Sequence, residues 1–369
     1  MGKLILDSLE INNFKAFEHL CIEKLGRVNL IAGKNNVGKT CLLEALYLYA
    51  SGAAPSVLRN ILSARDESPP QEFNRSTSNP PAPDALVAFK SLGRLFHGDS
   101  PASSQISIGQ MKPGNASIGL ELRMLSSDDN KEQFESVIPI QALKPTSEPA
   151  LGVLYRGQLD HVYSVPNVFK SSYPDHAALN HAYPYQFVNS SGYTVAPLLQ
   201  LWDKIQLTDA ELRLVEALRI IAPNVERVSI RGREDLFGPT PIVKLAGIDE
   251  PVPLRSLGDG MNRLFRIALA LVNAKDGFLL IDKIENGFHY TVMPDVWRLI
   301  LKIAKDLNVQ VFATTHSWDC VEGFQEATAE GEQEDGMMMR LSRKKTGIVP
   351  VLYDRRRITL AKEHRIEVR

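Results

Sequence analysis

The sequence predicts an α/β fold with a mixed central sheet flanked by helices, an antiparallel β subdomain and a helical insertion. The central sheet is indicated by apolar segments of strand length at residues 27–32, 278–282 and 310–317. The subdomain is indicated by short alternating segments between residues 106 and 163, which polar turns separate. We expect a single domain with one lobe over about residues 1–195 and another over about residues 196–369.

Turn-rich segments interrupt the first lobe, and a helical pattern opens the second. Residues 66–84 are rich in Pro, Ser and Asn, which predicts a disordered-type insertion. Thr208 is the expected N-cap of a helix, with Glu211 three residues later. The predicted apolar face of this helix comprises Leu212, Val215, Leu218 and Ile221. The segment from residue 338 to 369 is expected to form strands and a short helix.

The composition is that of a globular protein without an overall charge. With 44% hydrophobic residues among 369, the chain can bury a large core, which excludes disordered and fibrous classes. Lys and Arg number 42 against 43 Asp and Glu, so contact with nucleic acid would require a local patch. The basic run at residues 340–345 is one such patch, although a solvated hairpin is the favoured interpretation.

Neither a membrane segment nor a cysteine motif is found in the sequence. No apolar run approaches the roughly 20 residues of a membrane helix, and the first residues lack a signal-peptide core. We therefore expect a cytoplasmic protein without membrane contact. Cys21, Cys41 and Cys320 form no CxxC pair, which favours packing roles in a reducing compartment and argues against a structural zinc site.

The most specific motif is a phosphate-binding loop between a predicted strand and a predicted helix. Residues 33–40 read Gly-Lys-Asn-Asn-Val-Gly-Lys-Thr. In such a loop the backbone N–H groups face the phosphates, while Lys39 reaches the β and γ phosphates and Thr40 ligates Mg²⁺. The residues expected to contact ATP and Mg²⁺ here are Asn35, Asn36, Gly38, Lys39, Thr40 and Cys41.

Polar residues more than two hundred positions downstream are expected to complete the nucleotide site. Asp282 ends an apolar strand, where a carboxylate can reach the Mg²⁺ shell. His316 follows the next strand and is expected to donate to the γ-phosphate. Ser256, Gly258 and Gly260 precede an apolar helix and form a nest of N–H groups suited to a second nucleotide.

In this order the motifs resemble those of ATP-binding-cassette (ABC) type ATPases, specifically the SMC/RecF branch. Residues 9–17 resemble that branch's first strand and turn, residues 256–260 its signature motif, and His316 its switch histidine. Within the branch, residues 256–261, 279–290, 314–317 and 365–369 resemble OLD-like AAA-type ATP-binding proteins, here without the C-terminal Toprim nuclease domain. The resemblance implies an ABC-type P-loop ATPase head.

The resemblance also implies partners. In such proteins two ATP molecules lie between two heads, and each is bound by one subunit's phosphate loop and capped by the other's signature motif. A homodimer is therefore expected. Stand-alone ATPases of this kind often accompany a separate effector encoded nearby, frequently a nuclease, in bacterial defence against phage. Contact with DNA is left open.

The chain departs from the family pattern directly after Asp282, where the family carries a glutamate that polarises the attacking water. Lys283 stands here instead. An ammonium has no lone pair to accept a proton, and its reference pKa is about 10.4. Three interpretations remain: slow hydrolysis with a long-lived clamp, partial substitution by Glu285, or a variant that has lost turnover. We favour intact binding with slow or absent hydrolysis.

Two other functions compete with an ATP-gated dimer. An ATPase subunit of a transporter is disfavoured because more than two hundred residues separate Thr40 from Ser256. A non-hydrolysing scaffold that ATP stabilises by mass action is the second alternative. Dimerisation that depends on ATP separates the scaffold from the clamp.

Overall fold

The computed structural model describes most of the chain. The described residues are 3–70, 85–99, 105–111, 116–125, 134–135, 148–170, 173, 175, 178–190, 197–232, 238–329, 336–345 and 347–353. Most of the predicted insertion at residues 66–84 lies outside them, as does the short helix expected near the end of the chain. Among the described helices, none combines the length and apolar character that crossing a membrane requires.

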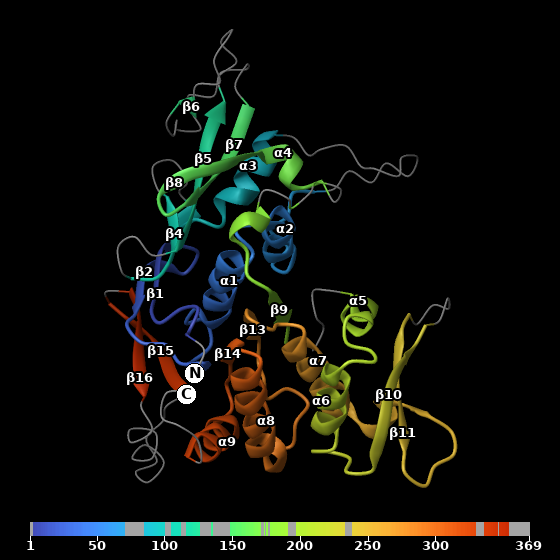
Figure 1. Cartoon of the computed structure of the whole chain (residues 1–369). Helices are drawn as coiled ribbons and strands as arrows, with labels where there is room; N and C mark the ends of the chain where they lie inside the picture. The colour runs from blue at the N-terminus through green and yellow to red at the C-terminus, as the bar shows by residue number, and fades with distance from the viewer. Residues whose placement is uncertain are drawn as a thin grey trace.

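A six-stranded central sheet organises the molecule (Figure 1). Its strands, in spatial order, are β16 (Gly347–Tyr353), β15 (Gly336–Lys344), β3 (Val28–Ala32), β14 (Gln310–Thr314), β13 (Phe278–Ile281) and β9 (Tyr185–Val188). All neighbours run parallel except β16, which is antiparallel to β15. Every residue of β3, β13 and β14 is buried, as expected for strands with both faces covered.

Helices cover both faces of this sheet and explain why its central strands β3, β13 and β14 are buried on both sides. α1 (Lys39–Ala50) lies on one face, where Phe278, Leu280 and Phe312 point. Eleven of its 12 residues are buried, because the antiparallel sheet covers its other side. Side chains from alternate positions, such as Leu279, pack on the opposite face. That face is covered by α7 (Asp259–Val272), α8 (Met293–Asp306) and α9 (Trp318–Ala329).

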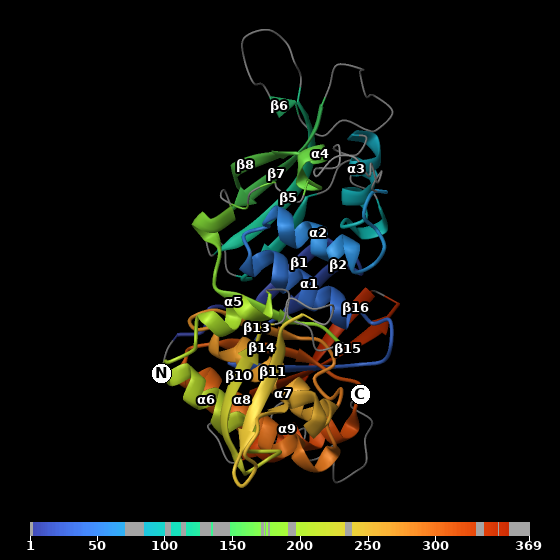
Figure 2. The same cartoon turned by 90° about the vertical axis from the view of Figure 1, so that its right-hand side faces the viewer.

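The predicted antiparallel subdomain is present as a seven-stranded sheet. Its path is β2 (Phe17–Ile22), β1 (Leu9–Phe14), β4 (Ile106–Gly109), β5 (Ser117–Leu125), β7 (Glu148–Tyr155) and β8 (Gln158–Ser164), with β6 (Phe134–Glu135) paired to β5. Helices α2 (Pro55–Ser63), α3 (Ala85–Gly93) and α4 (Val165–Val168) pack beside it. Figure 2 shows this layer above α1, with α7 to α9 below the central strands.

A smaller region beside α7 contains the remaining elements. It consists of α5 (Leu198–Asp203), α6 (Asp209–Leu218) and a three-stranded sheet of β10 (Val225–Arg231), β11 (Thr240–Leu245) and β12 (Val252–Pro253). Elsewhere along the described residues, short 3-10 helices lie at His97–Asp99, Ala178–His181, Leu254–Leu257 and Tyr290–Val292.

Helix α6 begins where the sequence predicted, but its buried face differs from the predicted one. The Thr208 hydroxyl accepts a hydrogen bond from the Ala210 N–H, as an N-cap does. The Glu211 carboxylate reaches one residue further back than expected and accepts from the Leu207 N–H at 2.6 Å. Leu212 is 63% exposed, so its assignment to the apolar face was wrong. The buried face of α6 comprises Leu214, Val215, Ala217 and Leu218.

Candidate functional site

The carboxyl ends of four neighbouring parallel strands meet at one edge of the central sheet. Ile281 of β13 lies in register with Ala313 of β14 and Val188 of β9, and Ala313 is in register with Leu30 of β3. The segments that follow these strands therefore start side by side. In open parallel sheets, ligands bind at this edge.

The phosphate loop follows β3, and its two glycines have backbone conformations that other residues rarely adopt. Gly33 has a φ of 140° and Gly38 a φ of 87°. A Cβ on Gly33 would lie 2.6 Å from the Leu341 carbonyl oxygen, and one on Gly38 would lie 2.9 Å from the Phe17 ring. Close approach on both sides thus requires glycine at these positions.

The other residues expected to contact the nucleotide occupy distinct positions on this loop. Asn35, Asn36 and Thr40 are exposed, and Asn36 has a left-handed φ of 60°. The Cys41 side chain is buried and accepts a hydrogen bond from the Arg65 guanidinium at 3.2 Å. Only the backbone of Cys41 can therefore take part in an anion nest at the start of α1.

Lys39 is the first residue of α1 and turns its ammonium back into the loop. Its Nζ donates to the carbonyl oxygens of Gly33 at 2.5 Å and Lys34 at 2.8 Å. Burial lowers the pKa of Lys39 to about 8, although the carboxylates of Asp282 and Glu285 oppose this shift. The ammonium thus lies within the electrostatic field of the two acidic residues that follow β13.

Asp282 is held by hydrogen bonds to the two strands that flank β13. Its backbone N–H donates to the Val188 carbonyl oxygen at 2.9 Å, and its Oδ1 accepts from the Thr314 hydroxyl at 2.7 Å. Thr314 is fully buried. Asp282 and Thr40 also line the same cavity of about 700 Å³. A hydroxyl and a carboxylate in one cavity are oxygen ligands that fit Mg²⁺.

Glu285 and His316 lie together at the same edge. The Glu285 Oε1 accepts from the His316 backbone N–H at 2.8 Å. Its second oxygen, Oε2, is buried and has no hydrogen-bond partner among the described residues. Burial lowers the pKa of His316, and the nearby Lys39 ammonium lowers it further. A neutral imidazole at pH 7 keeps one N–H donor and one acceptor.

Lys283 lies between these groups with its backbone held on both sides. Its N–H donates to the Thr314 hydroxyl at 2.8 Å, and its carbonyl oxygen accepts from Arg263 at 3.1 Å. Its φ of 51° is left-handed, which is uncommon for a residue other than glycine. Its charge adds to the lowering of the pKa of both Lys39 and His316. The position after Asp282 therefore places a lysine, rather than a third carboxylate, beside Asp282 and Glu285.

The predicted signature residues lie elsewhere, at the N-terminus of α7. Ser256 and Gly258 are exposed, and Gly258 has a φ of 98°. A Cβ on Gly260 would lie 2.7 Å from the Gly287 carbonyl oxygen, so this turn packs on the segment that follows Asp282. None of the contacts among described residues brings Ser256 or Gly258 to the phosphate loop of the same chain.

Two contributors to the site were missed by sequence reasoning. Arg263 of α7 is only 5% exposed and donates to the carbonyl oxygens of Asn189 at 2.7 Å, Asp282 at 2.9 Å and Lys283 at 3.1 Å. Asn189 follows β9 and lines the cavity with Thr40 and Asp282. The β9 segment is a short apolar run, which could have indicated a fourth parallel strand but does not show its neighbours.

Comparison with known proteins agrees with this architecture. A family model described as "AAA domain, putative AbiEii toxin, Type IV TA system" matches residues 28–319. An ATP/GTP phosphatase of Helicobacter pylori is 27% identical over 349 residues, which cover 86% of this chain and 87% of that protein. The DNA replication and repair protein RecF of Clostridioides difficile is 43% identical over 47 residues, 13% of each chain.

Among solved structures, an SMC head bound to the C-terminal winged-helix domain of ScpA shares the fold. The TM-score is 0.51 with 14% sequence identity, over 98% of this chain and 99% of that one. The predicted fold class is thereby confirmed. Since the family model spans well over half of the sequence, the chain belongs to this AAA-domain family, and it has the fold of an SMC head.

Proposed function

We propose that the protein binds ATP with Mg²⁺ at the carboxyl edge of its central sheet. The observation that carries this proposal is the convergence of Lys39, Asp282 and His316 on one edge, from segments up to 277 positions apart (316 − 39). Lys39 and the loop N–H groups would hold the phosphates, and Thr40 with Asp282 would hold the metal ion. The Helicobacter pylori relative, named as an ATP/GTP phosphatase, supports a nucleoside triphosphate as the ligand.

The second part of the proposal is a homodimer that forms around two ATP molecules. Ser256 and Gly258 are exposed on the turn before α7, away from the phosphate loop of their own chain. N–H groups at a helix N-terminus attract phosphate oxygens. The phosphates bound by a second copy would therefore meet this turn, and each site would use residues from both subunits.

The third part concerns turnover, which we propose is slow. Lys283 occupies the position from which a carboxylate would polarise the attacking water, and an ammonium cannot accept its proton. Glu285 is the nearest alternative in the sequence; its Oε1 is engaged by the His316 N–H, and its Oε2, which has no partner among the described residues, is buried, so we propose that it substitutes only in part. Occupancy of the site would then be the lasting signal, and hydrolysis would end it.

The output of this signal is proposed to be control of a separate effector protein, such as a nuclease encoded nearby, in bacterial anti-phage defence or DNA transactions. The SMC head of similar fold was solved with a partner domain bound. Contact with DNA through the basic strand β15 remains part of the proposal. Pull-down with the neighbouring gene product, with and without ATP, tests the effector.

The substitution Lys283→Glu tests the turnover proposal. The backbone at this position is held by Thr314 and Arg263. A left-handed φ of 51° is equally unfavourable for Lys and for Glu, so the loop should keep its shape in the variant. A positioned general base contributes about 10²- to 10⁴-fold to a rate. We expect the steady-state ATPase rate of the variant to rise by at least about tenfold, measured as phosphate release from ATP-Mg²⁺.

Lys283→Gln is the matched control, because it removes the charge without supplying a base. Its rate should stay near that of the wild type. If Lys283→Glu is no faster than Lys283→Gln in the purified protein, the position does not limit turnover. Equal activation by both variants would assign the effect to the lost positive charge, and would also contradict the proposal.

A further inference from the structure

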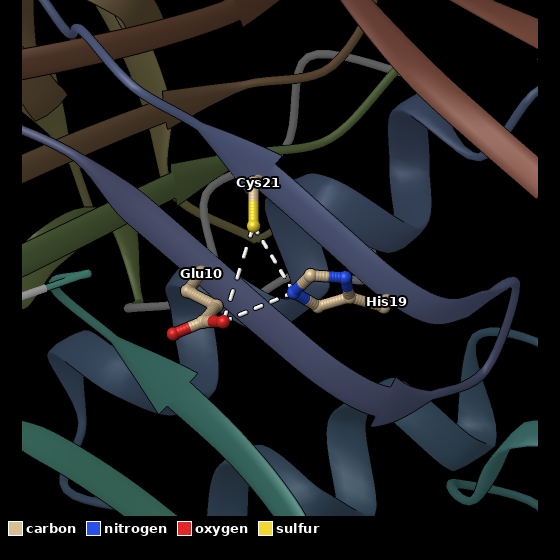
Figure 3. Close-up of side chains that lie close together, drawn as sticks. All are labelled: Glu10, His19 and Cys21. Carbon is tan, nitrogen blue, oxygen red and sulfur yellow. Dashed lines mark hydrogen bonds and ion pairs between the residues drawn. The ribbon is translucent and has the colours of Figure 1, made fainter.

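Three side chains with different metal-binding donors gather on the β1–β2 hairpin, outside the nucleotide site. Figure 3 shows Glu10, His19 and Cys21 pointing toward one another. The His19 Nε2 lies 3.0 Å from the Glu10 Oε1 and 3.0 Å from the Cys21 Sγ. The Cys21 Sγ lies 3.9 Å from the same Glu10 oxygen. One imidazole nitrogen thus faces both a carboxylate and a thiol.

The antiparallel register explains why these three residues meet. Glu10 is directly opposite Cys21, and His19 is opposite Asn12. Side chains two positions apart on a strand point to the same face, so His19 and Cys21 share a face with Glu10. The pairing of β1 with β2 therefore positions all three donor side chains, and no loop residue contributes a donor.

The donor set and its dimensions match a zinc ion with an open coordination position. Zinc binds thiolate sulfur at about 2.3 Å, imidazole nitrogen at about 2.0 Å and carboxylate oxygen at about 2.1 Å in tetrahedral geometry. Those bond lengths place the donor atoms roughly 3.4 to 3.6 Å apart. The observed separations of 3.0, 3.0 and 3.9 Å bracket this range, so rotation of side chains suffices.

Solvent can reach the cluster, which gives an ion an entry path. The side chain of His19 is 55% exposed and that of Glu10 is 36% exposed. Cys21 is half-buried, whereas Cys41 and Cys320 are buried. Cys21 is thus the thiol among the three that a soluble reagent or ion would meet first.

We propose that Glu10, His19 and Cys21 form a binding site for a divalent transition metal of the zinc class. A thiolate combined with an imidazole selects such ions over Mg²⁺ and Ca²⁺, which prefer oxygen ligands. Water occupies the fourth position. The absence of a CxxC pair in the sequence disfavoured such a site, and the register of two strands supplies it in another way.

The site lies close to the phosphate loop along the same hairpin. Phe17 begins β2 two residues before His19, and it is buried in the core with Leu20 and Ile22. Its ring packs against Gly38, where an added Cβ would lie 2.9 Å away. A metal ion that joins β1 to β2 would brace the part of the hairpin that supports this loop.

Zinc binding to the untagged full chain, stripped with a chelator and free of nucleotide, tests the proposal. Isothermal titration with Zn²⁺ should show one equivalent bound in the wild type. Cys21→Ser, His19→Gln and Glu10→Gln should each weaken zinc binding. The loss of a residue that only hydrogen-bonds to a metal ligand lowers metal affinity by up to about 100-fold, so the loss of the Cys21 ligand itself should lower it by at least roughly 100-fold. Glu18→Gln is the matched control, because Glu18 is an exposed neighbour on β2 with the same charge.

Protection of the thiol gives a second, independent measurement. Zn²⁺ should slow alkylation of Cys21 by iodoacetamide in the wild type and in Glu18→Gln, but not in His19→Gln, as followed by mass spectrometry. Absence of stoichiometric zinc binding would overturn the proposal. So would binding that survives Cys21→Ser, or a loss in Glu18→Gln equal to that in Glu10→Gln.

Discussion

The carboxyl edge of the central sheet and the N-terminus of α7 differ in how many of the predicted site residues lie together there. At the sheet edge, Lys39, Asp282 and His316 come together from three separate segments within one chain. At α7, Ser256 and Gly258 are exposed, and none of the contacts among the described residues joins them to the phosphate loop. Under the proposed function, the sheet edge is one half of a nucleotide site and the exposed turn before α7 is the other half, used by a second copy.

The buried side chain of Arg263 connects the two regions. Arg263 belongs to α7, yet its guanidinium holds the backbone of Asp282 and Lys283 beyond the far end of β13. Burial lowers its pKa to about 10, and Asp282 and Glu285 counteract that shift. A displacement of the α7 N-terminus would therefore move the backbone of Asp282. Substitution of Arg263 is the first test of whether the two regions are connected.

The largest expected effect on stability comes from Arg263→Met. Three carbonyl oxygens lose their donor, that of Asp282 in a buried hydrogen bond and those of Asn189 and Lys283 in partly buried ones. An unsatisfied buried acceptor costs about 1 to 3 kcal/mol, offset in part because no charge remains buried. We expect the free energy of unfolding, measured in urea, to fall by about 3 kcal/mol. Arg255→Met, at an exposed position before the same helix, should change it by less than about 0.5 kcal/mol. If both variants lower the free energy of unfolding equally, the buried hydrogen bonds of Arg263 do not connect α7 to the sheet edge.

The next effect concerns the sheet edge alone. Lys39→Ala removes a charged hydrogen-bond donor worth about 1.5 to 3 kcal/mol, so ATP affinity should fall roughly 10- to 100-fold. The matched control is Lys34→Ala, since Lys34 is an exposed cation of the same loop. It should weaken binding by less than about fivefold. Fluorescence titration with a labelled ATP analogue measures both, and similar losses would mean that general charge attraction, not the position of Lys39, holds the phosphates.

A smaller effect follows from the pKa of Lys39, which burial lowers to about 8. Below this pH the ammonium is charged and binds phosphate directly. Above it, the free protein has lost this proton and must take it up on binding, whereas phosphate groups with a pKa near 6 no longer titrate. ATP affinity should therefore fall about tenfold between pH 7 and pH 9. Lys39→Arg, which stays charged, should show no such fall, and a flat wild-type profile would contradict the assignment.

Much of the sheet edge could be predicted because each of its parts carries a local signal. The loop glycines, the apolar strand before Asp282 and the strand before His316 are recognisable from a few adjacent residues. Parallel pairing then brings their ends together. The predicted face of α6 failed at Leu212 because spacing alone does not show which side of a helix has a neighbour.

The parts that could not be predicted depend on contacts across the fold. Arg263 appears in the sequence as one arginine in an apolar helix, and only the packing of α7 against β13 shows what its guanidinium reaches. Likewise, Glu10, His19 and Cys21 follow no known metal-binding spacing, and strand register brings them together. Long-range pairing of this kind leaves no local pattern.

The most direct measurement of the central claim is the mass of the protein in solution with ATP-Mg²⁺, determined by light scattering. With an incomplete site on each chain, the wild type should shift from the mass of one chain to that of two when ATP-Mg²⁺ is added. Ser256→Arg, which places a bulky side chain on the exposed turn, should bind ATP but remain a single chain. An unchanged wild-type mass with saturating ATP-Mg²⁺, or a dimer that Ser256→Arg leaves intact, would contradict the account.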